Sequence, residues 1–340
     1  MTVRNKDMTA RSTVAARQVC ALLDFAVSRG AKRSDLLKRA RIDAVDLRDA
    51  DERIPFDRYV ALMRAAKTAC DDPALALHFG EAIDLEDISI VGMVNGGDSL
   101  AAGGFDLMNR YGRLDFDLMG DGAPRFVMRD SWLIDERPDS NDFPELTECT
   151  FARMACTIRR YFGDRPFLMA VNVTHAEPAY RAEYDRILQV PVTFGSDQNA
   201  LVLAAGAWTA RAPAARPISD YAASVMTAHA DALLEDLAKS DSMRGRVESA
   251  LLSILHTGEA NVESIARQLG LSRQTLFRKL KAEGVTFEKV LDELRRTIAT
   301  KYLRGKNATV AEAAYLVGFS DAAAFSRAFK RWTGSSPGSY

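Results

Sequence analysis

Cysteine and histidine are scarce in this sequence, with four of each in 340 residues. No two cysteines form a Cys-x-x-Cys pair, and no histidine stands near enough to Cys20, Cys70, Cys149 or Cys156 to complete a zinc-binding pattern. We expect these cysteines to be buried and reduced. The sequence predicts no metal site and no cofactor.

Long hydrophobic runs are also missing. The longest apolar stretch, Leu201 to Trp208, is much shorter than the roughly 20 residues that a membrane-spanning helix needs. The opening residues, MTVRNKDMTARS, are polar and lack the apolar segment of a signal peptide. The sequence therefore predicts a soluble, cytoplasmic protein with a flexible start over residues 1–10.

Several catalytic motifs are absent as well. The sequence contains no P-loop and no His-Glu-x-x-His pattern. No cysteine lies in a Pro-Cys-His-type setting, in which a nearby base activates the thiol. We therefore expect no enzymatic activity.

Neither sign of charge dominates the whole chain, whose formal net charge is -1, but the charge is unevenly distributed. From Met243 to Tyr340 there are 16 Lys and Arg against 9 Asp and Glu, whereas the rest of the chain has 29 against 37. Contact with nucleic acid requires positive charge only where phosphate groups are touched. The basic C-terminal part is therefore a candidate for such contact.

The first third of the chain is predicted to be helical. Apolar residues recur at helical spacing from a cap at Ser12 or Thr13 to a stop at Gly30, and again over residues 56–70. Pro73 fits the first turn of a further helix.

After Gly120-Asp121-Gly122 the pattern changes to short segments with the composition of strands. The predicted strands cover residues 125–135, 167–174, 192–194 and 200–203, with helices at 145–162 and 179–188. Residues 11–240 are therefore predicted to form one α+β domain with a small sheet.

A segment with two prolines, residues 211–217, precedes the predicted closing helix of that domain at about 218–239. Tyr221, Val225, His229 and Leu233 share one face of this helix. Two roles stay open for the face: closure of the domain core and contact with a second copy of the chain. Lys239 to Met243 is the predicted linker.

Residues 243–340 are predicted to be all-helical and contain an internal repeat. Glu263-Ser-Ile-Ala-Arg-Gln-Leu-Gly-Leu-Ser272 is echoed by Ala311-Glu-Ala-Ala-Tyr-Leu-Val-Gly-Phe-Ser320. Each copy has a short helix, a glycine for the turn and a serine expected to cap the next helix. The repeat predicts two helix-turn-helix units, at about 262–284 and 310–334.

The second helix of each unit has a predicted buried stripe and a polar or basic outer face. The stripe is Leu276 with Leu280 in the first copy and Phe325 with Phe329 in the second, 49 positions later. The outer positions are Gln274, Phe277, Arg278 and Lys281, matched by Ala323, Ser326, Arg327 and Lys330. Such a face suits the major groove, where Arg and Gln read base edges and Lys and Ser hold phosphates.

Between the units, residues 287–303 are predicted to form an amphipathic helix of about 17 residues, or roughly 25 Å. It is expected to hold two recognition helices apart. Successive major grooves lie about 34 Å apart on one face of B-DNA. If the helix sets the recognition helices closer than that, the DNA should bend or one helix should sit shallowly.

Two segments of this part match a known pattern. They read Val317-Gly-Phe-Ser-Asp-Ala-Ala-Ala-Phe-Ser-Arg-Ala-Phe-Lys-Arg-Trp-Thr-Gly-Ser-Ser-Pro337 and, earlier, Leu271-Ser-Arg-Gln-Thr-Leu-Phe-Arg-Lys-Leu-Lys-Ala-Glu-Gly284. They resemble the DNA-binding domain of AraC/XylS-type transcriptional regulators. The resemblance implies a seven-helix, two-headed domain, usually of an activator that contacts promoter DNA and RNA polymerase.

The repeat and the resemblance together predict a set of DNA-contacting residues. They are Ser272, Arg273, Gln274, Thr275, Phe277, Arg278, Lys281, Ser320, Ala323, Ser326, Arg327 and Lys330. Ala322, Ala323 and Ala324 stand where relatives often carry polar residues, so we expect the first unit to supply most base discrimination. Phe277 keeps two interpretations, contact with a thymine methyl or sugar and packing toward the domain core.

The first domain also resembles a known type. Its segments Leu75-Ala-Leu-His-Phe-Gly-Glu81 and Val171-Asn-Val-Thr-His-Ala-Glu-Pro-Ala-Tyr-Arg-Ala-Glu-Tyr-Asp-Arg-Ile-Leu-Gln-Val-Pro-Val-Thr-Phe-Gly195 resemble the arabinose-binding-type N-terminal domain of one branch of these regulators. The resemblance spans roughly residues 20–205 and implies effector binding and dimerisation, without identifying the effector. His175 and Tyr180 are candidates for its pocket, although a structural histidine at a strand end is the preferred interpretation.

The leading hypothesis is a ligand-responsive transcription factor at the cytoplasmic nucleoid. Residues 1–240 would sense an effector and form a homodimer, and residues 243–340 would bind promoter DNA. Two alternatives stay open: an enzyme with a DNA-targeting tail, and a sequence-tolerant architectural DNA-binding protein.

Overall fold

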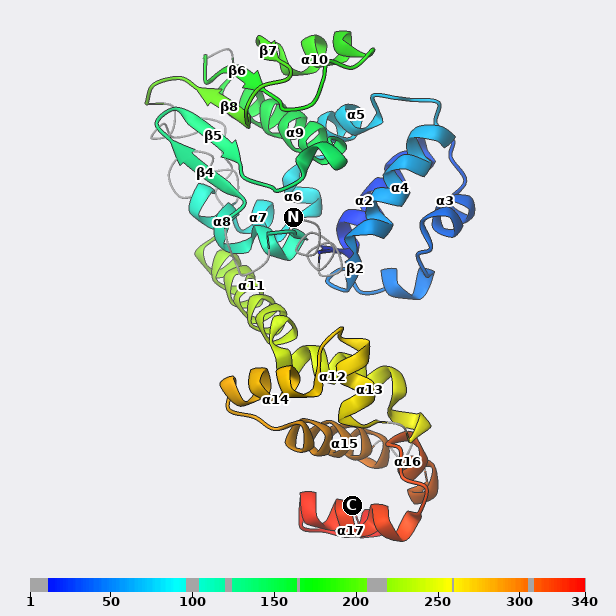
Figure 1. The fold of residues 1–340 in the computed structure, drawn as a ribbon. Coiled ribbons are helices and arrows are strands. Elements are labelled where there is room, and N and C mark those ends of the chain that lie inside the picture. Colours follow the sequence, from blue (N-terminus) through cyan, green and yellow to red (C-terminus); the bar gives the residue numbers. More distant parts are fainter. Residues whose placement is uncertain are drawn as a thin grey trace. The chain divides into compact units, whose positions relative to one another are not determined.

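The chain forms two compact units, Met1–Leu234 and Glu235–Tyr340, in a computed structural model (Figure 1). The structure describes residues 12–95, 104–119, 124–163, 166–206, 219–258, 260–304 and 309–339. Residues 1–10, Gly120-Asp121-Gly122 and residues 211–217 lie outside these ranges. None of the described helices is both long and apolar enough to cross a membrane.

The first unit combines helices with two sheets, as the α+β prediction requires. Its helices are α2 (Ala16–Ser28), α3 (Arg33–Ala40), α4 (Phe56–Ala69), α5 (Leu75–Ala82), α6 (Leu85–Ile88), α7 (Ile90–Asn95), α8 (Gly104–Asp115), α9 (Glu145–Phe162), α10 (Arg181–Leu188) and α11 (Asp220–Asp241), with short 3-10 helices at Ala44–Leu47 and Ser140–Asp142. Its strands are β1 (Thr13–Ala15), β2 (Arg53–Pro55), β3 (Phe116–Asp117), β4 (Phe126–Arg129), β5 (Trp132–Asp135), β6 (Leu168–Asn172), β7 (Val192–Thr193) and β8 (Asn199–Leu203).

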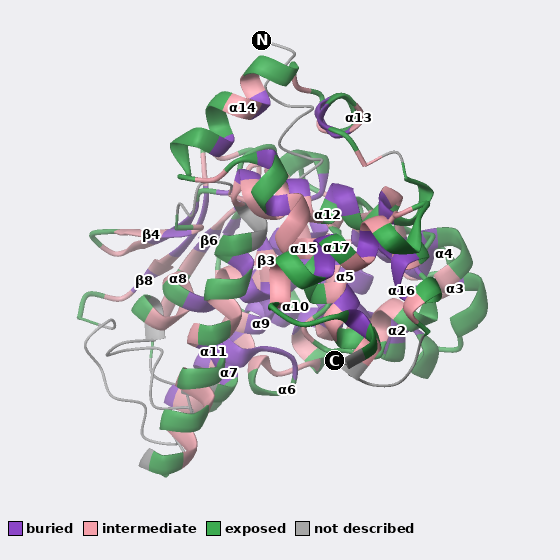
Figure 2. Cartoon of the chain, turned by 90° about the horizontal axis from the view of Figure 1, so that it is seen from below, coloured by how far each residue is buried: buried purple, intermediate pink, exposed green. Residues whose placement is uncertain are grey.

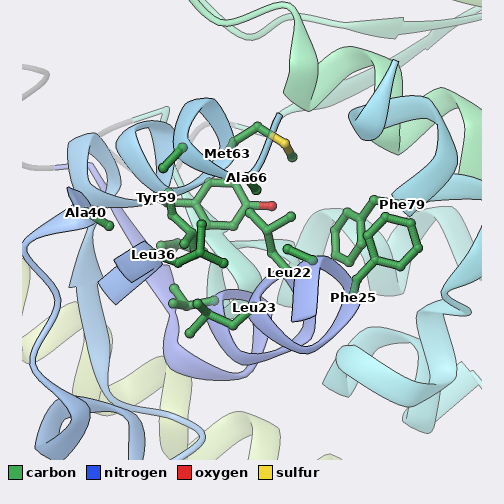
Figure 3. Packing of buried hydrophobic residues seen from close by; sticks show 14 of the residues in the cluster. Leu22, Leu23, Phe25, Leu36, Ala40, Tyr59, Met63, Ala66 and Phe79 are labelled. Atoms are coloured by element: carbon green, nitrogen blue, oxygen red, sulfur yellow. The ribbon is translucent and has the colours of Figure 1, made fainter. Parts of the chain in front are cut away.

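One core of this unit lies between α2, α3 and α4. Leu22 and Leu23 of α2 pack there with Tyr59 and Met63 of α4, and all four are fully buried (Figure 3). Burial of such large apolar side chains, at about 1.5 to 3 kcal/mol each, holds these helices together. The helix predicted over residues 56–70 is confirmed.

The start of the first helix differs from the prediction. Residues 13–15 form β1, which pairs antiparallel with β2 and β3, so the helix begins only at Ala16. The prediction of a cap at Ser12 or Thr13 is therefore wrong. Helical periodicity in α2 does not reveal that the residues before it pair with a segment 40 positions away.

The second core lies between α9 and a five-stranded sheet of order β4-β5-β8-β6-β7. The neighbours pair antiparallel except β6 and β7, which are parallel. The predicted strands are confirmed, and residues 125–135 form a hairpin of β4 and β5. Helix α9 matches its predicted bounds and contributes Cys149 to the first core and Phe151 to the second. It therefore connects the two cores.

Helix α11 is attached to the first unit by polar contacts. Asp231 accepts hydrogen bonds from the Tyr111 hydroxyl and the Arg110 guanidinium of α8, both at 2.8 Å. His229 Nε2 lies 3.3 Å from Asp51 Oδ2. Two large apolar residues near the start of the same helix are less covered: Tyr221 is 80% exposed and Val225 is 51% exposed.

The segment predicted as a linker is largely helical. Helix α11 continues through Lys239 to Asp241, and the Ser242 side chain then caps α12. The division into compact units falls inside α11, between Leu234 and Glu235. The domain limits at residues 240 and 243 stay a prediction.

The second unit is helical throughout its described residues. After the end of α11 come α12 (Met243–Ile254), α13 (Val262–Gln268), α14 (Arg273–Ala282), α15 (Phe287–Arg304), α16 (Val310–Leu316) and α17 (Ala322–Thr333), with 3-10 helices at Leu255–Thr257 and Pro337–Ser339. Helix α15 confirms the predicted helix between the repeats. Phe287 and Val290 pack with α12, α13 and α14, whereas Ala299 packs with α16 and α17. One long helix thus connects two small cores.

Candidate nucleic-acid interface

The first helix-turn-helix unit consists of α13, a turn at Gly270 and α14. Gly270 has a φ of 65°, in the left-handed region that glycine adopts readily. The Ser272 side chain accepts a hydrogen bond from the Thr275 backbone N–H at 3.2 Å and so caps α14 as predicted. Leu276 and Leu280 are both completely buried. Since these two residues are buried, the exposed side chains of α14 lie on its other faces.

The second helix-turn-helix unit repeats this plan with α16, a turn at Gly318 and α17. Thr309 and Glu312 form a reciprocal capping box at the start of α16. Gly318 has a φ of 77°, and a Cβ there would lie only 2.1 Å from the Leu255 carbonyl oxygen. Phe325 and Phe329 are completely buried, which confirms the stripe predicted for α17.

The cap of α17 differs from the prediction. Asp321, not Ser320, caps the helix, accepting hydrogen bonds at 2.9 Å from the backbone N–H groups of Ala323 and Ala324. These bonds hold the pKa of the Asp321 carboxyl below its usual range. The turn after Gly318 is one residue longer than the turn after Gly270, which explains why the two copies are offset by 48 positions before the turn and 49 after it.

Several predicted contact residues are exposed and available. Gln274, Arg278 and Lys281 on α14 are exposed, and so are Arg327 and Lys330 on α17. None of the five side chains makes a hydrogen bond or ion pair with another described residue, although the Arg327 charge helps to lower the pKa of Asp321. In Figure 2, α14 is coloured as exposed over most of its length. The two helices therefore present uncommitted polar and cationic groups.

Other predicted residues near the start of α14 already have partners. Arg273 forms a 2.9 Å ion pair with Glu263 and lies over the Phe277 ring, 5.3 Å from its centroid. Phe277 is half-buried and packs against the core of the first helix-turn-helix unit. This favours the interpretation in which Phe277 packs toward the domain core. The hydroxyls of Ser272 and Thr275 lie 2.9 Å apart.

The remaining predicted contact residues of the second helix-turn-helix unit have small side chains. Ser320 and Ala323 are exposed, whereas Ser326 is half-buried. The Asp321 carboxylate occupies the first backbone N–H groups of α17 and adds a negative charge at that end. The two units thus have different local electrostatics despite their common plan.

Sequence reasoning missed Arg295, a half-buried cation of α15 that fixes the second turn. Its Nε donates to the Val317 carbonyl oxygen at 3.0 Å, and its guanidinium lies 4.7 Å from the Phe319 ring centroid. Burial lowers the pKa of Arg295. Its position next to Leu294 on the apolar side of the predicted helix was the available signal.

In the compact unit Met1–Leu234, the two candidate pocket residues, His175 and Tyr180, both contact Tyr184. His175 Nδ1 lies 2.9 Å from the Ala176 carbonyl oxygen and Nε2 lies 3.0 Å from the Tyr184 hydroxyl. The Tyr180 hydroxyl donates to Glu148 Oε1 at 2.8 Å. Both ring nitrogens of His175 have partners, as expected for a structural histidine.

Comparison with known proteins supplies the family. A family model described as "Arabinose-binding domain of AraC transcription regulator, N-term" matches residues 30–211, more than half of the chain. The chain belongs to the AraC family of transcription regulators. A second model, "Helix-turn-helix domain", matches residues 265–340. This AraC-family chain thus joins an N-terminal ligand-binding type of domain to a helix-turn-helix DNA-binding domain.

Individual relatives agree with this assignment. The chain is 26% identical to the ornithine utilization regulator of Pseudomonas aeruginosa over 327 residues, 94% of each protein. It is 30% identical to the transcriptional regulator VirS of Mycobacterium tuberculosis over 195 residues, 57% of this chain and 55% of VirS. It is 33% identical to the transcriptional activator NphR of a Rhodococcus species over 105 residues, 31% of each. These relatives are regulators.

Proposed function

We propose that this AraC-family chain activates transcription by inserting α14 and α17 into successive major grooves of a promoter. The observation that carries the proposal is the paired chemistry of the two helices. Arg278 with Lys281 and Arg327 with Lys330 are exposed and have no hydrogen-bond or ion-pair partner among the described residues. Exposed guanidinium and ammonium groups on a recognition helix can read guanine edges and neutralise phosphates.

Selection of genomic DNA fragments by the full-length protein at about physiological salt tests this proposal. We expect enriched fragments that share two short motifs about one helical turn apart. The double variant Arg278→Ala/Arg327→Ala should lose the enrichment. The variant Lys289→Ala/Lys301→Ala, which removes the same charge from exposed positions of α15, should keep it. Equal enrichment by both variants, or binding without sequence preference, would contradict base reading.

The proposal assigns effector binding and dimerisation to the first unit. The arabinose-binding type of domain supports the sensing role, and the exposed Tyr221 and Val225 of α11 support pairing with a second copy. An effector regulates DNA binding only if it binds one arrangement of the protein more tightly than another. Because α11 also enters the second unit, it is the element through which such a preference would be transmitted.

Activation implies contact with RNA polymerase. The name of the relative NphR, a transcriptional activator, supports this direction of regulation. Transcription in vitro from a selected promoter, with purified polymerase, tests it. We expect more transcript on addition of the protein, and less transcript would establish repression instead.

We propose that the chain has no enzymatic activity and acts in the cytoplasm, at the nucleoid. Burial raises the pKa of the thiols of Cys20, Cys70, Cys149 and Cys156, which is the opposite of what a nucleophilic cysteine requires. Residues 334–338 have Gly-x-Ser-x-Gly spacing, but they follow helix α17. The nucleophilic serine of that motif lies on a turn that follows a strand. Slow thiol labelling of the folded protein would agree with this proposal.

A further inference from the structure

A buried carboxyl group lies between α9 and α10. Glu148 of α9 is 2% exposed, and its Oε1 accepts hydrogen bonds from the Tyr180 hydroxyl at 2.8 Å and the Tyr184 hydroxyl at 2.7 Å. Tyr184 is itself 1% exposed. Two donors therefore converge on one oxygen of a side chain that is withdrawn from water.

The other oxygen of this carboxyl group is unsatisfied. Glu148 Oε2 is buried and has no hydrogen-bond partner among the described residues. Leaving a buried polar atom without a partner is unfavourable, and more so when the atom is charged. Burial accordingly raises the pKa of Glu148. A ligand that donates a hydrogen bond and carries positive charge would satisfy the free oxygen and favour the ionised carboxylate.

The charged neighbours of Glu148 are already engaged. Glu145, on the same helix, accepts from Lys67 Nζ of α4 at 2.9 Å. The ammonium group of Lys67 also lies 5.8 Å from the Tyr180 ring centroid. Lys67 and Glu145 thus offset each other, and Glu148 keeps one oxygen free for a further cation.

The two tyrosines that bond this carboxyl group belong to an aromatic cluster. The rings of Tyr180 and Tyr184 are stacked with centroids 6.3 Å apart, and Phe194 meets Tyr184 edge-on at 5.0 Å. Tyr180 and Phe194 are half-buried, so the cluster reaches the surface. The Arg181 guanidinium lies over Phe194, 5.6 Å from its centroid. Ring faces in this cluster therefore already attract the protein's own cations, as ring quadrupoles do.

We propose that Glu148, Tyr180 and Tyr184 form a subsite for an ammonium group of the effector, so that the effector is an organic amine. The inference rests on the proposed function, in which the first unit binds a small molecule. A buried carboxylate flanked by aromatic rings binds an organic cation through charge, a hydrogen bond and the ring faces together. The acidic balance of residues 1–242 adds a favourable long-range potential for a cationic ligand.

Ligand-observed NMR titration of the full-length protein with n-butylamine tests the proposal, with 1-butanol as the neutral analogue of similar shape. We expect n-butylamine to bind at least tenfold more tightly than 1-butanol. Glu148→Gln should weaken amine binding at least tenfold, whereas Glu136→Gln, at a surface ion pair with Arg129, should leave it unchanged. Equal affinity for amine and alcohol, or an unchanged affinity in Glu148→Gln, would overturn the proposal.

A second pair of variants decides the matter if Glu148→Gln does not fold. Tyr180→Leu removes the aromatic ring and should weaken amine binding about fivefold or more relative to Tyr180→Phe, which keeps the ring. Equal affinity of these two variants would contradict the aromatic contribution and, with it, the proposed subsite. Binding of a selected DNA fragment is measured on the same samples. Wild-type protein that binds the selected DNA fragment but not n-butylamine overturns only the subsite, whereas wild-type protein without sequence-specific DNA binding overturns the proposed function.

Discussion

At the scale of single residues, Arg278 is expected to contact a base edge and Lys330 a phosphate. Arg278→Ala should relax specificity at one base position of the first half-site and cost about 1 to 3 kcal/mol there, because guanidinium contacts to base edges carry sequence information. Lys330→Ala should weaken binding to all sequences similarly, because phosphate contacts carry no sequence information. It should also reduce the slope of log affinity against log salt concentration by about 1. Competition binding with point-mutated operators measures both. Equal losses on every sequence for Arg278→Ala would refute its base-reading role.

The glycines of the two turns provide a second residue-scale prediction. Gly270→Ala should destabilise the protein by about 1 to 2 kcal/mol, since its left-handed backbone disfavours a side chain while the space around it is open. Gly318→Ala should destabilise it by more, because the added Cβ also meets the Leu255 carbonyl oxygen. Denaturant unfolding monitored by circular dichroism compares the two. Similar destabilisation by both variants would count against the close approach at Gly318.

Residue types predicted much of the interface, and packing decided the rest. The spacing of Leu276, Leu280, Phe325 and Phe329 was sufficient to identify the buried stripes, and hence the opposite faces with Arg278 and Arg327. The spacing of residues in the sequence could not show that Arg273 pairs with Glu263 or that Phe277 packs against the core, because both contacts join different helices. The convergence of Tyr180 and Tyr184 on Glu148 was equally hidden, since 32 or more positions separate the partners.

At the scale of secondary-structure elements, the caps of α14 and α17 yield contrasting expectations. Ser272→Ala should destabilise the protein by about 0.5 to 2 kcal/mol, the usual effect of losing a helix cap. Ser320→Ala should have little effect on stability, because Asp321 caps α17. Thermal unfolding of both variants provides the comparison. A loss of stability in Ser320→Ala larger than that in Ser272→Ala would contradict the cap at Asp321 and favour the predicted cap at Ser320.

The same cap has a pH dependence with a definite sign. The pKa of Asp321 is lower in the folded protein than in the unfolded chain, so its capping stabilises the fold above the unfolded pKa of about 3.9. This stabilisation is lost as the pH falls through the lower pKa of the folded state. We expect the difference in unfolding free energy between wild type and Asp321→Ala to be constant near neutral pH and to shrink in acid. A difference that grows on acidification would contradict this cap.

Local patterns predicted most elements, and long-range pairing accounts for those they missed. Amphipathic periodicity located α4, α9, α15 and both recognition helices, because each buries one face of a continuous helix. Strand β1 was missed because its stability comes from pairing with β2 and β3, which periodicity does not report. The missed cap at Asp321 reflects a turn that is one residue longer in the second repeat.

At the scale of the whole molecule, the exposed apolar positions of α11 predict a dimer. The variant Tyr221→Glu/Val225→Glu should shift the protein from dimer to monomer, because it places charges where a second copy would pack. Tyr315→Glu, at another exposed aromatic, serves as the control and should remain dimeric. Sedimentation velocity measures the change. A wild-type protein that is monomeric at all concentrations would contradict the role proposed for α11.

The central claim is that two recognition helices of one chain read two neighbouring segments of DNA. Hydroxyl-radical footprinting on a selected promoter fragment tests it most directly, with the wild type, Arg278→Ala and Arg327→Ala in parallel. The account predicts two protected segments about one helical turn apart for each bound chain, with each variant weakening protection of a different segment. A single protected segment, or the same loss of protection in both variants, would contradict it.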